Sequence, residues 1–195
     1  MTSDIFTAKQ RIIWDYDQEH LPRITILEGA VRSGKSFVNN FLWVAHVNQF
    51  KGMGVRFIMT GATIASLQRN VLDDLSIFGI YAELNKRNEF KMLGNTVACF
   101  GTDKVDSYRA MKGFTAYGWY ANEVTEHHIN SVAQAQNRCS GPGARIFWDT
   151  NPAGPNHPIK VNYVNHDGQT LADGRVNIKS WHFTIDDNTH LEPQY

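Results

Sequence analysis

The chain has 195 residues, with 19 Lys and Arg against 19 Asp and Glu and a formal net charge of zero when histidine is neutral. This length suits one α/β domain with a substantial core and is too short for two domains that each have one. A domain that grips DNA alone along a wide basic face carries an excess of positive charge. We therefore expect any nucleic-acid contact to be local, or to be assembled from several copies.

Cysteine, histidine and hydropathy patterns exclude several classes of protein. Cys99 and Cys139 lack metal-binding spacing, which favours a reducing cytoplasmic setting. Residues 1–4 lack a basic region followed by an apolar run, and no segment approaches the length of a membrane span, so we expect a soluble protein. The eight histidines show no ligand spacing, and we interpret residues 127–128 as solvated residues at a helix start rather than zinc ligands.

The first predicted strand covers residues 23–28, and an apolar-rich helix is predicted over 37–50. Between them stands GAVRSGKS, residues 29–36, which fits the phosphate-loop pattern at every fixed position. A triphosphate is a polyanion, so its binding loop needs inward backbone N–H groups, little side-chain bulk and one cation. The strand, loop and helix context is the one that the motif requires, so the sequence predicts nucleotide binding.

The positions of this loop have distinct predicted roles. Gly29 and Gly34 let the backbone curl and approach the phosphates, Lys35 reaches the β and γ phosphates, and the Ser36 hydroxyl can ligate Mg²⁺. The predicted nucleotide-binding residues of the loop are Gly29, Ala30, Val31, Arg32, Ser33, Gly34, Lys35 and Ser36. Binding of ATP and Mg²⁺ does not by itself imply hydrolysis, which has to be argued from other residues.

The remaining elements follow in alternation along the chain. Apolar runs bounded by turn residues predict further strands over 54–61, in the two halves of a β-hairpin at 89–101 with its turn at Gly94 and Asn95, over 116–123, in the run that ends at 150, and over 175–185. Helical periodicity predicts helices over 63–78 and 127–138. The polar segment 103–113 and the Gly/Pro-rich segment 151–158 are predicted loops.

Strands that alternate with helices predict a mostly parallel central sheet flanked by helices on both faces. Ligands of such sheets bind at the carboxyl ends of the strands. The phosphate loop, residues 122–123 and residues 150–151 all follow strand ends. We therefore expect an α/β phosphate-loop NTPase with an added β-hairpin, in which these three polar features converge on one edge of the sheet.

The end of the 116–123 strand departs from the usual hydrolytic pattern. A hydrolytic phosphate-loop enzyme places an acidic residue there to organise Mg²⁺, often followed by a Glu that orients or deprotonates the attacking water. The segment WYANEVTE provides Glu123 at the second place but Asn122 where Asp is expected. An amide oxygen can accept from a metal-bound water but carries no charge, so we expect weaker Mg²⁺ organisation and a retained catalytic role for Glu123. The alternative is that Glu123 is an ordinary polar residue ending a strand.

Several segments, taken in order, resemble the large terminase subunit of tailed bacteriophages, the motor that pumps the genome into the capsid. The resemblance is carried by FTAKQ, GAVRSGKS, YRAMKGFTAYGWYANEVTE, NRCSGPGARIFWDTNPAGPNHPIK and FTIDDNTHLEPQY, which span nearly the whole chain. The stretch TNPAGPNHP weighs most, because generic helicases and nucleotide kinases do not share it. The resemblance implies a RecA-like, additional-strand fold of the terminase ATPase type.

The resemblance also implies roles for single residues. Gln10 is similar to the glutamine that reads adenine in this family, and the alternative is a solvated helix residue. Lys35 and Ser36 match the phosphate and Mg²⁺ residues, and Glu123 matches the catalytic carboxylate. These positions imply a Mg²⁺-dependent ATPase.

Two further roles concern coupling and charge stabilisation. Thr150 and Asn151 resemble the coupling motif that senses the γ phosphate, and the alternative is strand-end capping and turn chemistry. A motor of this kind also needs a cation on the transferring phosphoryl group. The candidates are Arg32, Arg109 and Arg138, and we prefer Arg109, in the polar loop, as a finger offered in trans.

The resemblance further implies partners and a domain boundary. The partners would be double-stranded DNA, a homo-oligomeric ring on the portal, the small terminase subunit and a C-terminal nuclease domain, in the cytoplasm of the infected host. We expect residues 1–185 to form the ATPase domain and residues 186–195 to begin a linker toward a nuclease domain that is absent here. Asp186, Asp187 and Glu192 cluster on one terminal segment, so we interpret them as linker residues rather than as a two-metal nuclease site.

Three other functions stay open from the sequence. A helicase-like translocase would be stimulated by single-stranded DNA. A nucleotide-gated assembly module would bind ATP with little turnover, as Asn122 suggests. A small-molecule kinase is disfavoured because no lid rich in arginine is recognisable.

Overall fold

The computed structural model describes residues 5–189, in which seven strands form one sheet in the order β3-β4-β2-β5-β6-β1-β7. The strands are β1 (Ile24–Gly29), β2 (Arg56–Gly61), β3 (Glu89–Met92), β4 (Asn95–Gly101), β5 (Gly118–Ala121), β6 (Arg145–Thr150) and β7 (Ile178–Phe183). All neighbouring strands pair in parallel except β3 and β4, which pair antiparallel. The predicted mostly parallel sheet with an added β-hairpin is confirmed.

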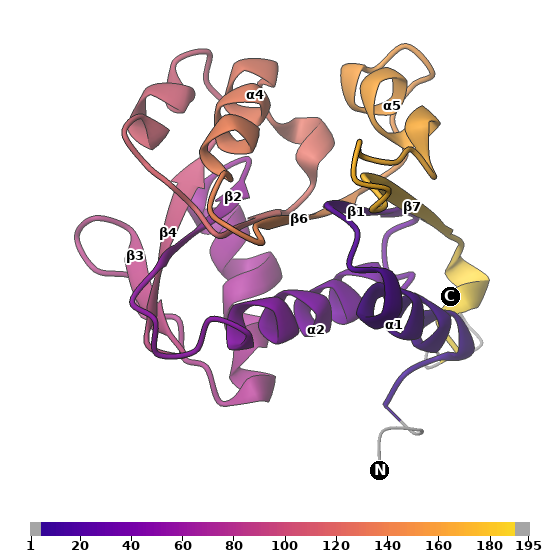
Figure 1. Cartoon of the computed structure of the whole chain (residues 1–195), viewed down its shortest axis with the longest axis horizontal. Coiled ribbons are helices and arrows are strands. Elements are labelled where there is room, and N and C mark those ends of the chain that lie inside the picture. Colours follow the sequence, from indigo (N-terminus) through magenta and orange to yellow (C-terminus); the bar gives the residue numbers. More distant parts are fainter. Residues whose placement is uncertain (1–4, 190–195) are drawn as a thin grey trace.

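Helices cover both faces of this sheet. The α-helices are α1 (Ala8–His20), α2 (Lys35–Asn48), α3 (Ile64–Leu67), α4 (Ile129–Arg138) and α5 (Pro158–Asn162). Shorter helical segments are η1 (Gln68–Leu72), η2 (Asp73–Phe78), η3 (Ser107–Met111), η4 (Val124–Glu126), η5 (Val164–His166) and η6 (Ile185–Asp187). Figure 1 shows α1 and α2 on one face and α4 and α5 on the other. In residues 5–189 no helix is long and apolar enough to cross a membrane.

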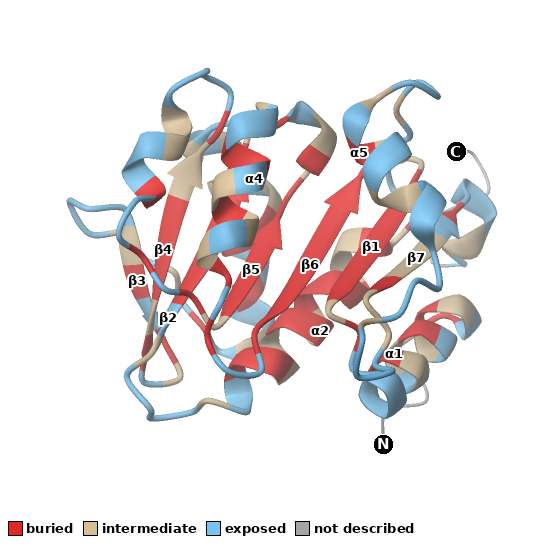
Figure 2. Ribbon diagram, turned by 45° about the horizontal axis from the view of Figure 1, so that its top comes forward, coloured by how far each residue is buried: buried red, intermediate tan, exposed pale blue. Residues whose placement is uncertain are grey.

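The central strands are buried on both faces, as Figure 2 shows by their red colour. Successive residues therefore point into two different cores. On β2, Phe57 belongs to the core that contains Leu42 of α2, whereas Ile58 belongs to the core that contains Val132 of α4. This arrangement explains why the central strands appear in the sequence as continuous apolar runs rather than as alternating patterns.

The prediction of one continuous α-helix over residues 63–78 is wrong. Thr63 caps only one α-helical turn, α3, and the chain continues through the π-helical η1 and the 3₁₀-helical η2. A π-helical turn is wider than an α-helical one and is often found at functional sites. Here η1 carries Arg69 and Asn70, which line the cavity described below.

The turn of the β-hairpin is displaced by one residue from its prediction. Met92 pairs with Asn95, so the two-residue turn is Leu93-Gly94, and both residues have positive φ as this kind of turn requires. Asn95 is buried at the start of β4, where its side chain accepts from the Val55 backbone N–H at 3.1 Å and donates to the Phe50 carbonyl at 2.9 Å. The Asn95 side chain therefore stabilises the loop between α2 and β2, and Asn95 is not part of the hairpin turn.

Two helices, one short helical turn and one buried histidine were not predicted from the sequence. The bounds of α1 and α5 were not predicted, and the segment predicted as a loop at 103–113 contains the one-turn η3. His128 does cap α4, but His127 is buried and its Nε2 lies 2.8 Å from Thr60 Oγ1, so its interpretation as a solvated residue is wrong. Burial lowers the pKa of His127 to about 3, which keeps the imidazole neutral.

Candidate active site

A cavity of about 350 Å³ lies at the carboxyl ends of the central parallel strands. The side chains that line it come from the phosphate loop, from η1 and η2, and from the ends of β5 and β6: Val31, Arg32, Lys35, Ser36, Arg69, Asn70, Asp74, Asn122, Glu123, Asp149 and Asn151. The predicted convergence of the three polar features on one edge of the sheet is therefore confirmed.

The phosphate loop is shaped by its backbone conformation and by the strand beside it. Arg32 and Gly34 have positive φ, and Gly34 caps α2 without a side chain, so the first N–H groups of the helix are left for a ligand. A Cβ on Gly29 would lie 2.3 Å from the carbonyl oxygen of Phe183 on β7. Gly29 is therefore also required by the packing of β7.

Lys35 is the buried cation of the cavity. Its Nζ donates to the Ala30 carbonyl at 3.0 Å and to Asn151 Oδ1 at 3.1 Å. Burial lowers the pKa of Lys35, and the negative charges of Asp149 and Glu123 raise it. The ammonium group therefore lies between the phosphate loop and the end of β6. A phosphate oxygen bound there would offset the free-energy cost of burying its charge.

Asn151 connects the phosphate loop with the predicted catalytic carboxylate. Its Oδ1 accepts from Lys35, and its Nδ2 donates to Glu123 Oε1 at 3.4 Å. The backbone of Glu123 has φ 53° and ψ 56°, a left-handed conformation that costs a non-glycine residue of order 1–3 kcal/mol. The Glu123 N–H donates to Asp149 Oδ1 at 2.9 Å, which holds this conformation in place.

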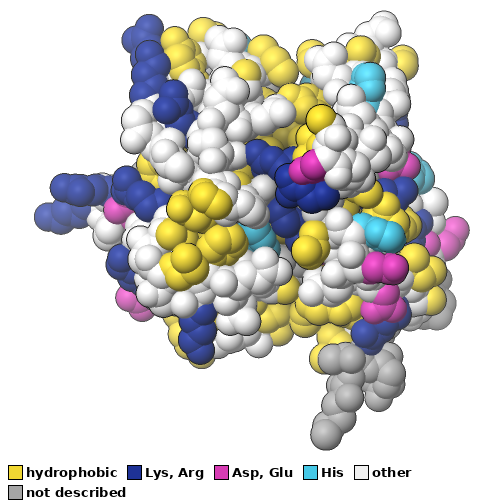
Figure 3. All heavy atoms as spheres, viewed as in Figure 1, with side chains coloured by type: hydrophobic (Ala, Val, Ile, Leu, Met, Phe, Trp, Pro, Cys, Tyr) yellow, Lys and Arg dark blue, Asp and Glu magenta, His cyan; other side chains and the backbone are white. Residues whose placement is uncertain are grey.

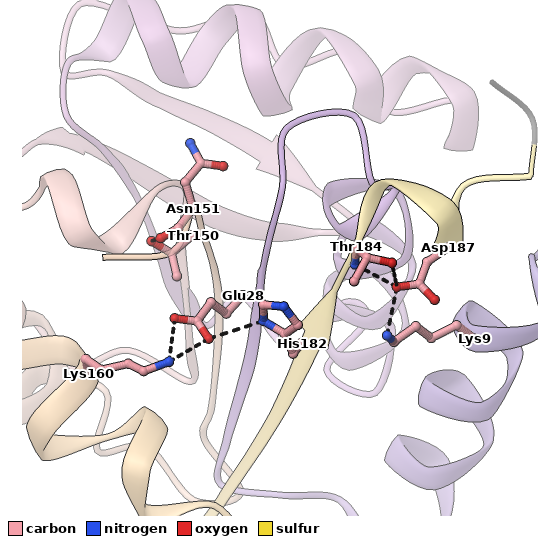
Figure 4. Close-up of polar contacts among 8 residues, drawn as sticks. All are labelled: Lys9, Glu28, Thr150, Asn151, Lys160, His182, Thr184 and Asp187. Atoms are coloured by element: carbon pink, nitrogen blue, oxygen red, sulfur yellow. Dashed lines mark hydrogen bonds and ion pairs between the residues drawn. The ribbon is translucent and has the colours of Figure 1, made fainter. Parts of the chain in front are cut away.

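Thr150 does not line the cavity but contacts the segment after Glu123. Its Oγ1 lies 2.6 Å from Thr125 Oγ1 on η4. In the ladder Thr150 pairs with Glu28, whose carboxylate accepts from Lys160 Nζ of α5 at 2.9 Å (Figure 4). The loop between β6 and α5 is therefore tied at both ends to the strand that precedes the phosphate loop.

Gln10 and Asn188 bracket the phosphate loop from outside the cavity. Gln10 is buried, so the alternative of a solvated helix residue is wrong, while its role in reading adenine stays a prediction. Its Nε2 donates to the Gly34 carbonyl at 2.9 Å, and Asn188 Nδ2 donates to the Arg32 carbonyl at 2.7 Å. Gln10, Gly34, Phe37 and Asn188 line a second hollow of about 280 Å³, which extends from the loop.

The segment after β7 packs against the domain that it follows. Thr184 is the N-cap of η6, and Asp187 accepts from the Thr184 N–H and forms an ion pair with Lys9 of α1 at 2.8 Å (Figure 4). Asp187 and Asn188 are therefore engaged with α1 and with the phosphate loop. The linker assignment of residues 186–195 stays a prediction, and residues 190–195, with Glu192, lie outside the described part of the chain.

The three arginine candidates have different positions. Arg32 lines the cavity. Arg109 is exposed on η3, with Asp106 Oδ2 at 3.7 Å, and Arg138 ends α4; neither lines the cavity. Arg69 of η1, which the sequence analysis did not single out, does line it.

Sequence reasoning also missed Asp149, Asn70 and Asp74 in the cavity wall. Asn70 Nδ2 donates to Asn122 Oδ1 at 3.1 Å, which fixes the orientation of that amide. Asp149 stands directly before the predicted coupling residues in WDTN, so its place as an acidic residue at the end of a core strand was a signal that could have identified it.

The oxygen atoms that line the cavity are of the kinds that bind Mg²⁺. Within residues 5–189 no three His, Cys, Asp or Glu side chains are grouped to hold a metal ion by themselves. Mg²⁺ is commonly held by one or two carboxylates together with substrate phosphates and water. The Ser36 hydroxyl and the carboxylates of Glu123 and Asp149 provide such a partial set of oxygen ligands, and the Asn122 amide oxygen can accept from a metal-bound water.

Basic side chains are scattered on the face that Figure 3 presents. Lys and Arg form separate groups there rather than a continuous band. This distribution agrees with the balanced charge of the sequence, with 19 basic and 19 acidic residues. Our expectation that any nucleic-acid contact is local or shared between copies stays a prediction.

Comparison with known proteins identifies the class. No protein-family model and no curated protein matches the sequence. Among solved structures, the chain is similar to the large terminase of a thermophilic bacteriophage in complex with ADP, with 30% identity, a TM-score of 0.80, and coverage of 97% of this chain and 48% of that one. The structure of the same terminase with ATP-gamma-S gives 28% identity, a TM-score of 0.74, and coverage of 97% and 47%.

A second phage protein shares the fold. The large terminase ATPase domain of Thermus phage P74-26 has 12% identity and a TM-score of 0.58, with coverage of 83% of this chain and 75% of that domain. The chain thus has the RecA-like fold of phosphate-loop NTPases. The resemblance to the large terminase subunit of bacteriophages, which the sequence motifs indicated, is confirmed. The chain spans about half the length of the terminase chain crystallised with ADP.

Proposed function

We propose that the chain is the ATP-hydrolysing motor domain of a genome-packaging terminase, which couples ATP hydrolysis to translocation of double-stranded DNA into the procapsid. The observation that carries this proposal is the Asn151 side chain, which bridges Lys35 of the phosphate loop and Glu123 in one cavity. The ADP and ATP-gamma-S complexes of the similar thermophilic-phage terminase support a nucleotide as the ligand of this cavity.

In this proposal the phosphates of ATP lie against the loop residues 29–36. Lys35 contacts the β and γ phosphates and stabilises the charge that develops as the bond to the γ phosphate breaks. Mg²⁺, when bound, would neutralise part of the phosphate charge. The Ser36 hydroxyl and the end of β5 would hold it.

Glu123 acts on the attacking water. Its carboxylate lines the cavity and accepts a long hydrogen bond, 3.4 Å, from Asn151 Nδ2. A carboxylate at this place can orient the water and accept its proton while Lys35 stabilises the opposite side of the phosphoryl group. Hydrolysis therefore depends on Glu123 more than nucleotide binding does.

Coupling would begin at Asn151 and Thr150. A γ phosphate that takes the Lys35 ammonium would compete with the 3.1 Å bond from Lys35 to Asn151. Its release would let this bond form again and shift the loop between β6 and α5, which is tied to Glu28 through Lys160. The Gln10 amide, beside the second hollow, is the group proposed to read adenine.

The partners follow from the same proposal. They are double-stranded DNA, further copies of the chain in a ring on the portal, the small terminase subunit, and a C-terminal nuclease domain of the same protein, in the cytoplasm of the infected bacterium. Residues 1–185 form the ATPase domain in this account, and residues 186–195 lead toward the nuclease domain.

Duplex DNA is expected to stimulate ATP hydrolysis by the chain, and single-stranded DNA of equal nucleotide content is not. The measurement is the steady-state rate with Mg²⁺ at fixed low salt, because phosphate contacts weaken steeply as salt rises. Stimulation by single strands alone would favour a helicase-like translocase. Tight ATP binding with no turnover on either DNA would favour a nucleotide-gated assembly module, the function that Asn122 suggests.

We also propose Arg109 as the finger offered to a neighbouring copy, since it is exposed and lies outside the cavity of its own chain. Activity per subunit should then rise with protein concentration as copies associate. Arg109→Ala should lose this rise and keep nucleotide affinity, while Arg87→Ala, at another exposed arginine, should behave as wild type. Activity per subunit that stays flat while light scattering reports association would contradict this role.

A further inference from the structure

The carboxylate of Asp149 is an unusual buried group of the cavity wall. Asp149 is fully buried at the penultimate position of β6. Its Oδ1 accepts from Asn122 Nδ2 at 3.0 Å and from the Glu123 N–H at 2.9 Å, and its Oδ2 accepts from the Tyr120 hydroxyl at 3.0 Å. All three of these donors are neutral.

Burial of an anion among neutral donors is costly. A carboxylate removed from water needs a cation nearby, or else it tends to take up a proton. Burial accordingly raises the pKa of Asp149, while its hydrogen bonds and the nearby Lys35 lower it. Asp149 also lines the cavity that contains Ser36 and Lys35. A divalent cation in this cavity would offset the cost of the buried charge.

The register of the sheet brings Asp149 next to the position where the sequence lacks a charge. Ala121 of β5 pairs with Trp148 of β6, so Asn122 and Asp149 follow at the same level on adjacent parallel strands. The Asn122 amide is fixed, because its nitrogen donates to Asp149 and its oxygen accepts from Asn70. A carboxylate from β6 therefore stands beside the end of β5, where an aspartate was expected.

We propose that Asp149 supplies to the Mg²⁺ site the negative charge that Asn122 lacks, and that Asn122 is a positioning residue which holds this carboxylate by its amide. The proposal rests on the proposed ATPase function and deepens it. It also explains the residue pair, because two aspartates at 122 and 149 would place carboxylate oxygens about 3 Å apart, where both cannot ionise readily.

The test measures equilibrium affinity for ADP and for ATP-gamma-S, with Mg²⁺ and with EDTA, in four chains: wild type, Asp149→Asn, Asn122→Asp and the double exchange. Asp149→Asn is expected to lose about 10-fold or more of the Mg²⁺-dependent gain in affinity and to keep the affinity seen in EDTA. The double exchange returns a carboxylate to the site and should regain most of the gain. The exposed Asp173→Asn is the control for net charge and should match wild type.

Thermal unfolding without nucleotide or Mg²⁺ gives a second readout that is independent of activity. Asn122→Asp should unfold at a lower temperature than wild type, because two adjacent carboxylates raise one pKa in the folded state. A group whose folded pKa is raised loses its contribution as pH rises, so this loss should be greater at pH 8 than at pH 5. The double exchange should recover part of it, since it keeps one carboxylate but leaves the Glu123 amide without its acceptor.

The outcomes separate this inference from the proposed function. If wild type binds no nucleotide, the proposed function is wrong and the inference falls with it. If wild type shows the Mg²⁺-dependent gain and Asp149→Asn keeps it in full, only the inference is overturned. Asp74→Asn changes another acidic residue of the cavity wall. If this variant loses the Mg²⁺-dependent gain in affinity while Asp149→Asn keeps it, the negative charge of the Mg²⁺ site comes from η2, and the inference is overturned.

Discussion

Glu123→Gln is expected to lower the rate of ATP hydrolysis by about 10²–10⁴-fold, the usual contribution of a general base. The substitution keeps the shape of the side chain and can keep a hydrogen bond to Asn151, but it removes the group that accepts the proton of the attacking water. Nucleotide affinity should change little, because Glu123 is proposed to contact water rather than ATP. Single-turnover hydrolysis, with ATP binding measured in parallel, separates the two effects.

Glu126→Gln is the matched control for this prediction. Glu126 is an exposed carboxylate on η4, three residues beyond Glu123, so its loss should leave the rate unchanged. Equal losses in the two variants would indicate a general effect of charge on this segment. A Glu123→Gln chain that hydrolyses ATP at the wild-type rate would refute the assigned role.

Lys35→Ala is expected to weaken ATP binding by about 100-fold or more, since it removes a buried charge-assisted contact with the phosphates, and such contacts are strong in a desolvated site. The nucleotide-free variant should unfold at no lower temperature than wild type, because burial already lowers the pKa of Lys35 and so disfavours its charged form. Isothermal titration with ATP and thermal unfolding without it measure the two quantities.

The control is Lys51→Ala, at an exposed lysine just beyond α2. This variant should bind ATP as wild type does. A Lys35→Ala chain that unfolds well below wild type would indicate that its loss of binding comes from damage to the fold. Unchanged ATP affinity in a stable Lys35→Ala chain would contradict the proposed binding mode.

The central strands were predictable because each central strand of a parallel sheet is buried on both faces and so appears as a continuous apolar run. α1 was harder, because two of its three buried residues are polar, Gln10 and Asp17. Asp17 is satisfied by an ion pair with Arg145, which starts β6 and lies far along the chain. Only tertiary structure places these partners together, so local pattern could not reveal them.

The candidate site was predictable to the extent that strand ends meet at one edge of a parallel sheet. The phosphate loop was identified by its motif, and the places of Glu123 and Asn151 at strand ends predicted that they converge on it. Asp149 was missed because it lies inside an apolar run that was interpreted as core. The cavity residues of η1 were missed because the periodicity of residues 63–78 predicted a regular α-helix, whereas a π-helical turn is present.

The most direct test of the proposed function is the steady-state rate of Mg²⁺-dependent ATP hydrolysis by the wild-type chain beside Glu123→Gln, with ATP binding verified for both. We expect both chains to bind ATP and the wild type to hydrolyse it about 100-fold faster or more, as loss of a general base implies. Two chains that bind ATP equally and hydrolyse it at the same rate would contradict the claim that this cavity is an ATPase active site with Glu123 as its catalytic carboxylate.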